Sequence, residues 1–308
     1  MTIKQKIEII QKILKLNQTQ LAEKLGVSFA TFNSWWNEKS IPRLKKIAII
    51  DDLYLEVTGE KKIPDDFLVA KKQLLQKRSL KYKNIIKFIL SNPDIRDELV
   101  LKLTYHSNSI EGSTLTESDT SAILFNDVAL PNKSMIEHLE AKNHQFALLY
   151  LLDYVSSNKK IDENFILKIH SILMNGIFRD AGEYRKHGVR IVGANLPTAN
   201  YLSVPKLIKA VVKEINKKNN DIVCLITFVH SDFEKIHPFS DGNGRVGRLL
   251  MTAMLLKNGL APAIIEQERK QLYYIFLNKA QTKNDQTLLE DYICDAIFDG
   301  FDILERKS

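Results

Sequence analysis

Residues 221–236 constrain the fold of this chain more than any other segment. Apolar side chains occur there on nearly every side of a helical wheel, at Ile222, Val223, Leu225, Ile226, Phe228, Val229, Phe233 and Ile236. A helix that is apolar all round is normally buried at the centre of a domain. Helical periodicity over residues 135–155, 163–175, 205–217 and 287–304 supplies helices to surround it. The expected fold class is therefore mainly α.

Composition excludes several classes of protein. The chain has 308 residues, enough for two or three domains, and its 44% hydrophobic and 26% charged residues are ordinary for a globular protein. Two cysteines cannot build a disulfide framework or a four-sulfur zinc site. No apolar run approaches the ~20 residues that span a bilayer, and the charged, helically periodic N-terminus is unlike a signal peptide. We expect a cytoplasmic protein with no membrane partner.

The net charge of +7 is concentrated in one stretch. Residues 61–90 hold nine Lys and Arg against two Asp and Glu, whereas residues 91–308 are slightly acidic. Apolar residues punctuate this stretch, so it predicts a basic helical connector over residues 61–94. Two interpretations remain open for its charge: a solvated helix face, or contact with phosphates beside a DNA-binding unit.

Residues 1–60 predict a helix-turn-helix domain. One helix covers residues 3–16, a second starts at Thr19 and stops at Gly26, and Ser28 is suited to cap a third. This pattern and the stretch SWWNEKSIPR resemble the Xre/Cro helix-turn-helix family. The resemblance implies DNA as a partner, although Trp36 and Glu38 depart from the family pattern. A helix-turn-helix that contacts protein instead is the alternative.

That resemblance also implies the residues that would contact DNA. Base contacts would come from Ser28, Thr31 and Asn33, with Arg43 near phosphate.

The sequence HPFSDGNGRVGR, residues 237–248, combines the groups that a nucleotide polyphosphate site needs. His237 is suited to act as a base near neutral pH, and Asp241 offers hard oxygen ligands for Mg²⁺. The loop that follows opens a helix and can bind an anion through its N–H groups. Two arginines spaced i, i+3 share one face of that helix. These loop and arginine positions are Gly242, Asn243, Gly244, Arg245 and Arg248.

Two other interpretations of this segment are weaker. GNGRVG fits the dinucleotide pattern, but it follows a predicted helix where that pattern requires a strand. His237 and Asp241 could ligate a transition metal, yet His230 alone lies near enough in sequence to join them, and it is expected to be a core histidine.

The same twelve residues match the HxFx(D/E)GNGRxxR motif, and the chain resembles the Fic family over about residues 95–300. The resemblance implies a Fic domain over residues 95–308, built of helices with a small β-hairpin flap. AGEYRKHGVRIVGANLPTANYLSVP resembles the flap, with a strand at Val189 and Ile191. Tyr273 and Tyr274 lie in a segment similar to the helix that borders the adenine pocket.

The resemblance implies a protein adenylyltransferase, which moves AMP from ATP to a Ser, Thr or Tyr hydroxyl of a target protein and releases pyrophosphate. His237 would deprotonate the hydroxyl and Asp241 would hold Mg²⁺. The phosphates would lie on the loop residues and the two arginines named above. The target could be a second protein or the enzyme itself, and an oligomer could form.

A further motif, YHSNSIEG, resembles the inhibitory motif of the same family. Ser107 and Glu111 lie one helical turn apart and Gly112 follows, within an inhibitory helix expected over residues 103–113. A carboxylate at Glu111 that reached Arg248 would neutralise it and block the γ-phosphate site. Glu111 could also position water for removal of AMP. Two alternatives stay open: a DNA-binding regulator whose Fic core senses nucleotide, and transfer of another phosphate-bearing group such as phosphocholine.

Overall fold

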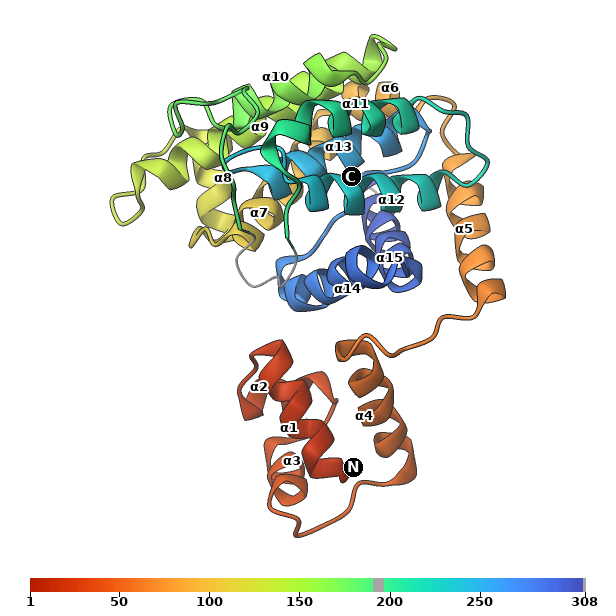
Figure 1. Ribbon diagram of the computed structural model, residues 1–308. Coiled ribbons are helices and arrows are strands. Elements are labelled where there is room, and N and C mark those ends of the chain that lie inside the picture. The colour runs from red at the N-terminus through yellow and green to blue at the C-terminus, as the bar shows by residue number, and fades with distance from the viewer. Residues whose placement is uncertain (191–196, 307–308) are drawn as a thin grey trace.

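The computed structural model describes residues 1–190 and 197–306 of a mainly helical protein (Figure 1). The N-terminal unit contains α1 (Ile3–Leu14), α2 (Gln18–Lys24), α3 (Phe29–Trp36) and α4 (Leu44–Val57). Two helices, α5 (Asp65–Ser79) and α6 (Ile85–Ser91), lead into the larger unit. The larger unit is built from α7 (Pro93–Glu111), α8 (Glu117–Asn126), α9 (Met135–Ser156), α10 (Glu163–Leu173), α11 (Val204–Ile215), α12 (Ile222–Ile236), α13 (Asn243–Lys257), α14 (Lys270–Lys283) and α15 (Thr287–Leu304). The predicted mainly α fold is confirmed.

Two consecutive helices form the centre of the larger unit. α12 packs against α11, α14 and α15, as its apolar circumference predicts. Only one side departs from that prediction, where Cys224 and Phe228 are exposed. α13 is enclosed still more completely, by α7, α9, α10 and α12, and nearly all of its side chains are buried. The loop between α12 and α13, residues 237–242, is therefore held at both ends by buried helices.

The predicted flap follows α10. Most of the expected hairpin, including Ile191, Gly193 and Asn195, lies outside the described residues. Its two flanks are described and face each other, because Arg190 and Pro197 form an antiparallel bridge and the Thr198 hydroxyl donates to the carbonyl of Val189 at 2.8 Å.

The basic connector is paired with acidic residues of this same chain. Lys71 lies 2.6 Å from both Asp291 and Asp295 on α15, and Arg78 lies 2.7 Å from Asp302. Lys72 contacts Asp221 and Glu290. Figure 1 shows α5 running along the side of the larger unit. Much of the +7 charge of residues 61–90 is therefore neutralised internally.

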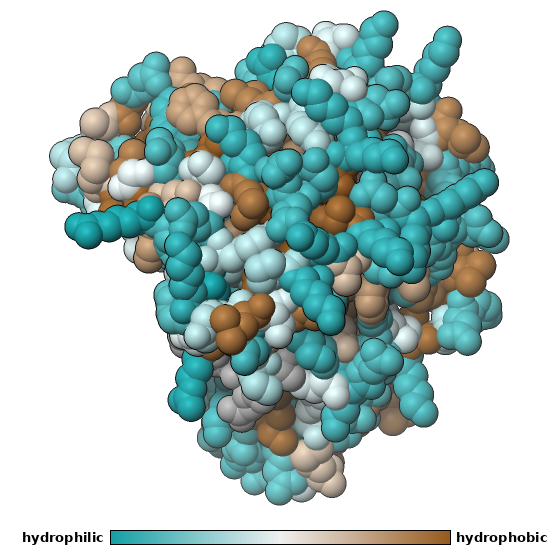
Figure 2. Space-filling model, turned by 45° about the horizontal axis from the view of Figure 1, so that its top comes forward, coloured by the Kyte–Doolittle hydropathy of each residue, from teal (hydrophilic) through white to brown (hydrophobic). Residues whose placement is uncertain are grey.

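The N-terminal unit lies against the larger unit at α14, which both α1 and α4 contact. None of the described helices is long and apolar enough to cross a membrane. Figure 2 shows a mainly hydrophilic face on which apolar residues are scattered.

Candidate active site

His237 ends α12 in a conformation that leaves one ring nitrogen available. Its backbone is left-handed, with φ of 53°, and its Nδ1 lies 3.2 Å from the carbonyl oxygen of Glu234. A carbonyl accepts only, so Nδ1 carries the proton and Nε2 keeps its lone pair. Burial lowers the pKa of His237 from its ordinary value, which keeps the ring neutral near pH 7. The imidazole is thus prepared to accept a proton at Nε2.

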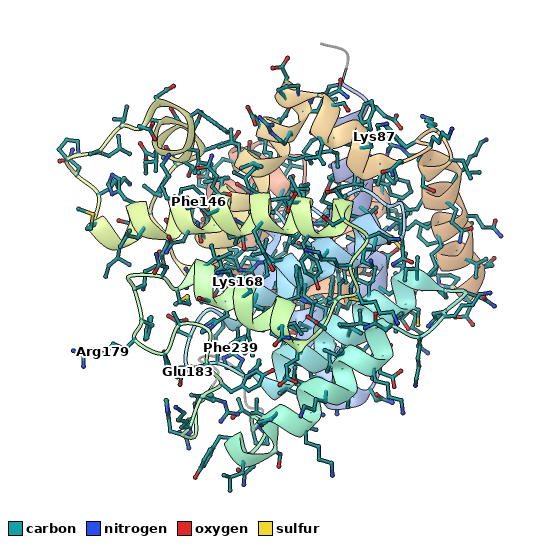
Figure 3. All side chains as sticks on the ribbon, turned by 90° about the horizontal axis from the view of Figure 1, so that it is seen from above. Lys87, Phe146, Lys168, Arg179, Glu183 and Phe239 are labelled. Carbon is teal, nitrogen blue, oxygen red and sulfur yellow. The ribbon has the colours of Figure 1, made fainter. Side chains whose placement is uncertain are left out.

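The loop after His237 is locked from within. The side chain of Asn243 accepts from the Phe239 amide at 2.8 Å and donates to the Phe239 carbonyl at 2.9 Å. Phe239 stacks on His170 of α10 with ring centroids 3.7 Å apart. It also lies beside Tyr184, the neighbour in sequence of the Glu183 labelled in Figure 3. The buried side chain of Asn243 thus holds the loop, and the phosphate contact predicted for this position would come from its backbone N–H group.

Gly242 shows why this loop needs glycine. Its φ is 77°, and an added Cβ would lie 2.8 Å from the Met174 sulfur. The Gly242 amide donates to the Asp241 carboxylate at 2.6 Å. About half of the Asp241 side chain is exposed, so its oxygens can also reach a ligand from solvent.

Arg248 and the predicted inhibitory motif come together across 137 positions of sequence. The Arg248 guanidinium donates to the Ser107 hydroxyl and carbonyl, both at 2.9 Å, and to the Glu111 carboxylate at 2.7 Å. Burial is the largest single influence on Glu111 and raises its pKa. The charge and hydrogen bond of Arg248, together with the charges of Arg245 and Lys270, outweigh burial and hold the pKa of Glu111 below its ordinary value. α7 ends at Glu111, and Gly112 follows with φ of 109°.

The Glu111 carboxylate also covers the start of α13. A Cβ added at Gly244 would lie 2.3 Å from Glu111 Oε1 and 3.0 Å from Arg248 Nη1. The carboxylate therefore occupies the space directly above the predicted anion-binding loop.

Arg245 pairs with carboxylates other than Glu111. Its side chain is almost fully buried and pairs with Glu140 of α9 at 2.6 Å, while its second terminal nitrogen lies 3.9 Å from Asp241. The two arginines predicted to bind phosphate therefore have different partners here: Glu140 and Asp241 for Arg245, and Ser107 and Glu111 for Arg248.

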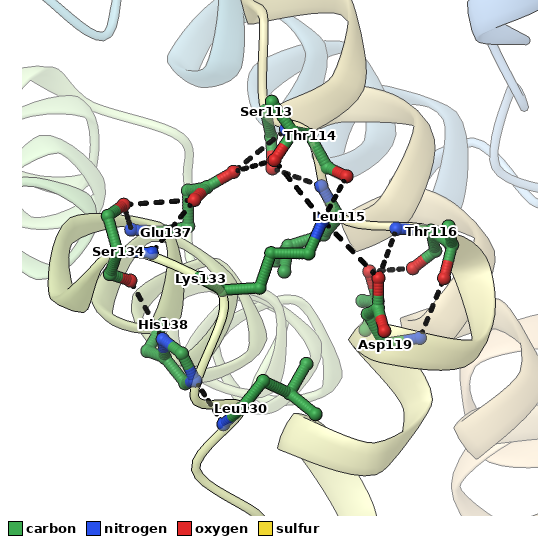
Figure 4. A network of polar contacts seen from close by, with 11 residues as sticks. Ser113, Thr114, Leu115, Thr116, Asp119, Leu130, Lys133, Ser134, Glu137 and His138 are labelled. Carbon is green, nitrogen blue, oxygen red and sulfur yellow. Dashed lines mark hydrogen bonds and ion pairs between the residues drawn. The ribbon is translucent and has the colours of Figure 1, made fainter.

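A polar cluster holds the chain just beyond Gly112 (Figure 4). Glu137 of α9 accepts from the Thr114 amide at 2.8 Å and from the Thr114 hydroxyl at 2.7 Å. Lys133 donates to the Thr114 carbonyl at 2.6 Å and lies 3.6 Å from Asp119. Hydrogen bonds to Thr114 and Ser134 lower the pKa of Glu137 to about 2, so the cluster stays charged at any ordinary pH.

The two predicted adenine-pocket tyrosines differ in position. Tyr273 is buried, with its hydroxyl 2.7 Å from His230, whereas Tyr274 is 37% exposed. His230 is the core histidine that was expected, since it is buried on α12.

The residues predicted to contact DNA lie on and beside α3. Ser28 caps α3 by accepting from the Thr31 amide at 3.3 Å, and both residues are exposed. Asn33 is half-buried and bonded to Asn37, and Arg43 is exposed where α4 begins. α3 itself carries no basic residue.

Motif reasoning missed three residues at the site: Glu140, Arg185 and Glu234. Glu140 and Arg185 are remote from the motif in sequence, and the packing of the chain brings them to the loop. Glu234 lies three residues before His237, just outside the motif.

Comparison with known proteins gives a consistent result. Residues 160–255 match the model of the Fic/DOC family. The chain is 37% identical over 181 residues to a protein adenylyltransferase Fic from Nematostella vectensis and 33% identical over 188 residues to one from Aedes aegypti. These matches cover 57% and 59% of this chain. The chain spans only about two fifths of the length of these relatives, 42% and 37%.

Solved structures show the same fold. A Fic domain containing signaling protein from Bacteroides thetaiotaomicron has a TM-score of 0.63 at 23% identity, over 78% of this chain and 97% of that one. Fic-1 from C. elegans has a TM-score of 0.60 at 20% identity, over 98% and 97% of the two chains. This chain is therefore similar to Fic proteins in sequence over residues 160–255 and shares their fold.

Proposed function

We propose that this chain is a self-inhibited protein adenylyltransferase. The observation that carries the proposal is the ion pair of Glu111 with Arg248 above Gly244, next to a His237 whose Nε2 is free to accept a proton. The relatives named protein adenylyltransferase support it. The two cysteines of the chain are unpaired, which fits the cytoplasm as its location.

The reaction uses the groups at the two ends of the loop. His237 Nε2 takes the proton of a Ser, Thr or Tyr hydroxyl as that oxygen attacks the α-phosphorus of ATP. The bond from the α-phosphorus to the bridging oxygen breaks, and pyrophosphate leaves. Asp241 is the residue of the motif suited to hold Mg²⁺, which would offset phosphate charge when bound.

Glu111 inhibits by binding Arg248, the residue that would otherwise bind the γ-phosphate of ATP. A bidentate contact of Arg248 with phosphate oxygens requires the nitrogen that now donates to Glu111. The carboxylate also repels the triphosphate. The same carboxylate can also orient a water molecule for removal of AMP from modified targets. An oligomer interface could hold or release Glu111.

Labelling with α-³²P-ATP and Mg²⁺ tests the proposal. We expect Glu111→Gly protein to label itself or a protein of its native lysate at least 10-fold more than wild type. Adding His237→Ala should abolish the label, and mass spectrometry should show AMP and not phosphocholine. If Glu111→Gly protein transfers no label to itself or to the lysate, the proposal fails.

DNA binding is a second candidate function, with the larger unit acting as a nucleotide sensor. It is favoured by the exposed Ser28 and Thr31 at the start of α3 and by exposed Lys24, Lys39 and Arg43 on the same unit. A gel shift against the promoter of its own gene, with and without ATP, tests it. Specific binding should weaken steeply with salt and on Thr31→Ala and Arg43→Ala substitution. Absence of a specific shift at low salt contradicts it.

A further inference from the structure

Arg185 is a buried cation held by backbone carbonyls. It is 2% exposed, and no carboxylate pairs with it among the described residues. Buried charges are rarely left without an acidic partner. The guanidinium is satisfied by four carbonyl oxygens: those of His237 at 2.7 Å, His187 at 2.8 Å, Ala199 at 2.5 Å and Ile236 at 3.3 Å. Burial of a guanidinium without a carboxylate partner is unfavourable, so we expect Arg185 to have a role besides packing.

Two of these carbonyls belong to the turn that orients His237. The last carbonyls of a helix have no partner inside it, and a cation at this end also suits the helix dipole. Arg185 bonds the carbonyls of Ile236 and His237 at the end of α12, and its own amide donates to the Pro238 carbonyl at 3.0 Å. His237 has a left-handed backbone, with φ of 53°, a conformation that costs a non-glycine residue free energy. Arg185 offsets that cost by bonding both sides of the turn.

The other two carbonyls belong to the two ends of the flap. His187 precedes the predicted hairpin and Ala199 follows it, and one guanidinium bonds to both. The flanks are joined again above Arg185, at the bridge between Arg190 and Pro197. The base of the flap and the His237 turn are therefore tied to a single side chain.

We propose that Arg185 is a positioning residue, which fixes the His237 imidazole relative to the described flanks of the flap, residues 187–190 and 197–199, so that Nε2 is held ready to accept the proton of an acceptor hydroxyl. This inference rests on the proposed function and concerns the geometry of transfer, not the binding of ATP. Arg185 makes no contact with Arg248 or Glu111, so ATP affinity should not depend on it.

The test uses full-length Glu111→Gly protein with a second change at Arg185. We expect Arg185→Met to lower kcat for AMP transfer at least 100-fold and Arg185→Lys about 10-fold, with the Kd for MgATP unchanged within 2-fold. Millimolar guanidinium chloride should restore part of the activity of Arg185→Gly. Arg179→Met is the matched control, since Arg179 is exposed and points outward on the preceding loop (Figure 3), and it should keep full activity.

Hydrogen exchange supplies a readout that needs no activity. Arg185→Met should speed amide exchange at least 10-fold in residues 187–190 and 236–240 together, because one side chain holds both. The inference is overturned if kcat stays unchanged in both Arg185 variants, or if kcat falls together with an equal loss of ATP affinity. Unchanged amide exchange in Arg185→Met also overturns it. If Glu111→Gly protein itself is inactive, the proposed function fails, and the exchange result alone decides the role of Arg185.

Discussion

Glu234 is a buried carboxyl group in an environment that disfavours its charged form. It is 6% exposed on α12, and its Oε1 has no hydrogen-bond partner among the described residues. A Cβ at Gly247 would lie 2.4 Å from that oxygen, so the glycine leaves room for the carboxyl in this position. Burial raises the pKa of Glu234 to about 8, against the opposing charge of Arg248. The folded protein therefore holds this carboxyl in its neutral form at pH 7.

We predict that Glu234→Gln stabilises the protein at neutral and alkaline pH. Between pH 4.5 and pH 8 the unfolded carboxyl is ionised while the folded one keeps its proton, so wild type loses stability as pH rises. The loss in the free energy of unfolding approaches ~1.4 kcal/mol per pH unit, and the variant avoids it because an amide does not titrate. Urea unfolding at pH 5 and pH 8 measures the difference. An advantage of the variant that does not grow with pH contradicts the pKa assignment.

At the scale of elements, the position of α7 relative to α13 determines the state of the site. The last turn of α7 brings Ser107 and Glu111 to Arg248, and Gly112 ends the helix. Two residues later, Glu137 and Lys133 bond the amide, hydroxyl and carbonyl of Thr114 (Figure 4). This cluster fixes the chain that leaves α7, so it opposes any movement of Glu111 away from Arg248.

We expect Glu137→Ala to activate the enzyme while leaving Glu111 intact. Thr114 would lose two hydrogen bonds, each worth about 1 kcal/mol, and the end of α7 would loosen. AMP transfer should rise about 3- to 10-fold above wild type and stay below that of Glu111→Gly. Glu117→Ala is the control, because Glu117 pairs with Lys102 on the adjacent helix and does not touch Thr114. Equal activity of Glu137→Ala and wild type would show that the cluster does not restrain α7.

The attachment of α5 to α15 gives a second prediction for an element. Lys72 is 15% exposed and pairs with Glu290, which is 8% exposed, and with the half-exposed Asp221. These two carboxylates and Cys224 have ligating atoms within 4.8 Å of one another, but the Lys72 ammonium already lies between the two carboxylates and offsets one of their two negative charges.

Lys72→Met should destabilise the protein by about 2–3 kcal/mol, because it leaves the buried carboxylate of Glu290 without a counterion. Thermal unfolding measures the loss. Adding Glu290→Met should recover much of it, and Lys77→Met, at an exposed position of the same helix, should change stability by less than about 0.5 kcal/mol. An unchanged Tm in Lys72→Met would contradict a structural role for the pair.

At the scale of the whole molecule, α14 is shared by two parts of the chain. Its buried side packs in the larger unit and carries Tyr273, while α1 and α4 of the N-terminal unit contact it from outside. The positive charge between these units is directed inward, to α15, so the connector offers less charge to an external polyanion than its sequence suggests. The proposed nucleotide site would depend instead on Arg248.

The molecule as a whole should report on nucleotide binding through its Tm. A ligand stabilises a protein according to its concentration relative to Kd, by ~2.7 kcal/mol at 100 times Kd. MgATP at 1 mM should therefore raise the Tm of Glu111→Gly protein by several degrees and that of wild type by clearly less, because Glu111 competes for Arg248. Glu111→Gly with Arg248→Met should show little shift. Equal shifts for wild type and Glu111→Gly would mean that Glu111 does not obstruct ATP.

The sequence by itself determined what is local. Helical periodicity and capping residues are encoded within a few positions of each other, so the central α12, the helices around it and the motif from His237 to Arg248 could all be predicted. The structure confirmed the fold class, and it ends the inhibitory helix at Glu111 within a longer α7 that begins at Pro93.

Only the tertiary structure decided which charges meet. Glu111 reaches Arg248 across 137 positions, Arg245 turns to Glu140 across 105, and Lys71 pairs with Asp291 across 220. Nothing in the local sequence distinguishes a lysine that contacts phosphate from one that pairs with aspartate. The choice depends on which helix faces pack together, because burial of apolar surface positions the helices and the ion pairs then form between whatever side chains that packing brings within reach.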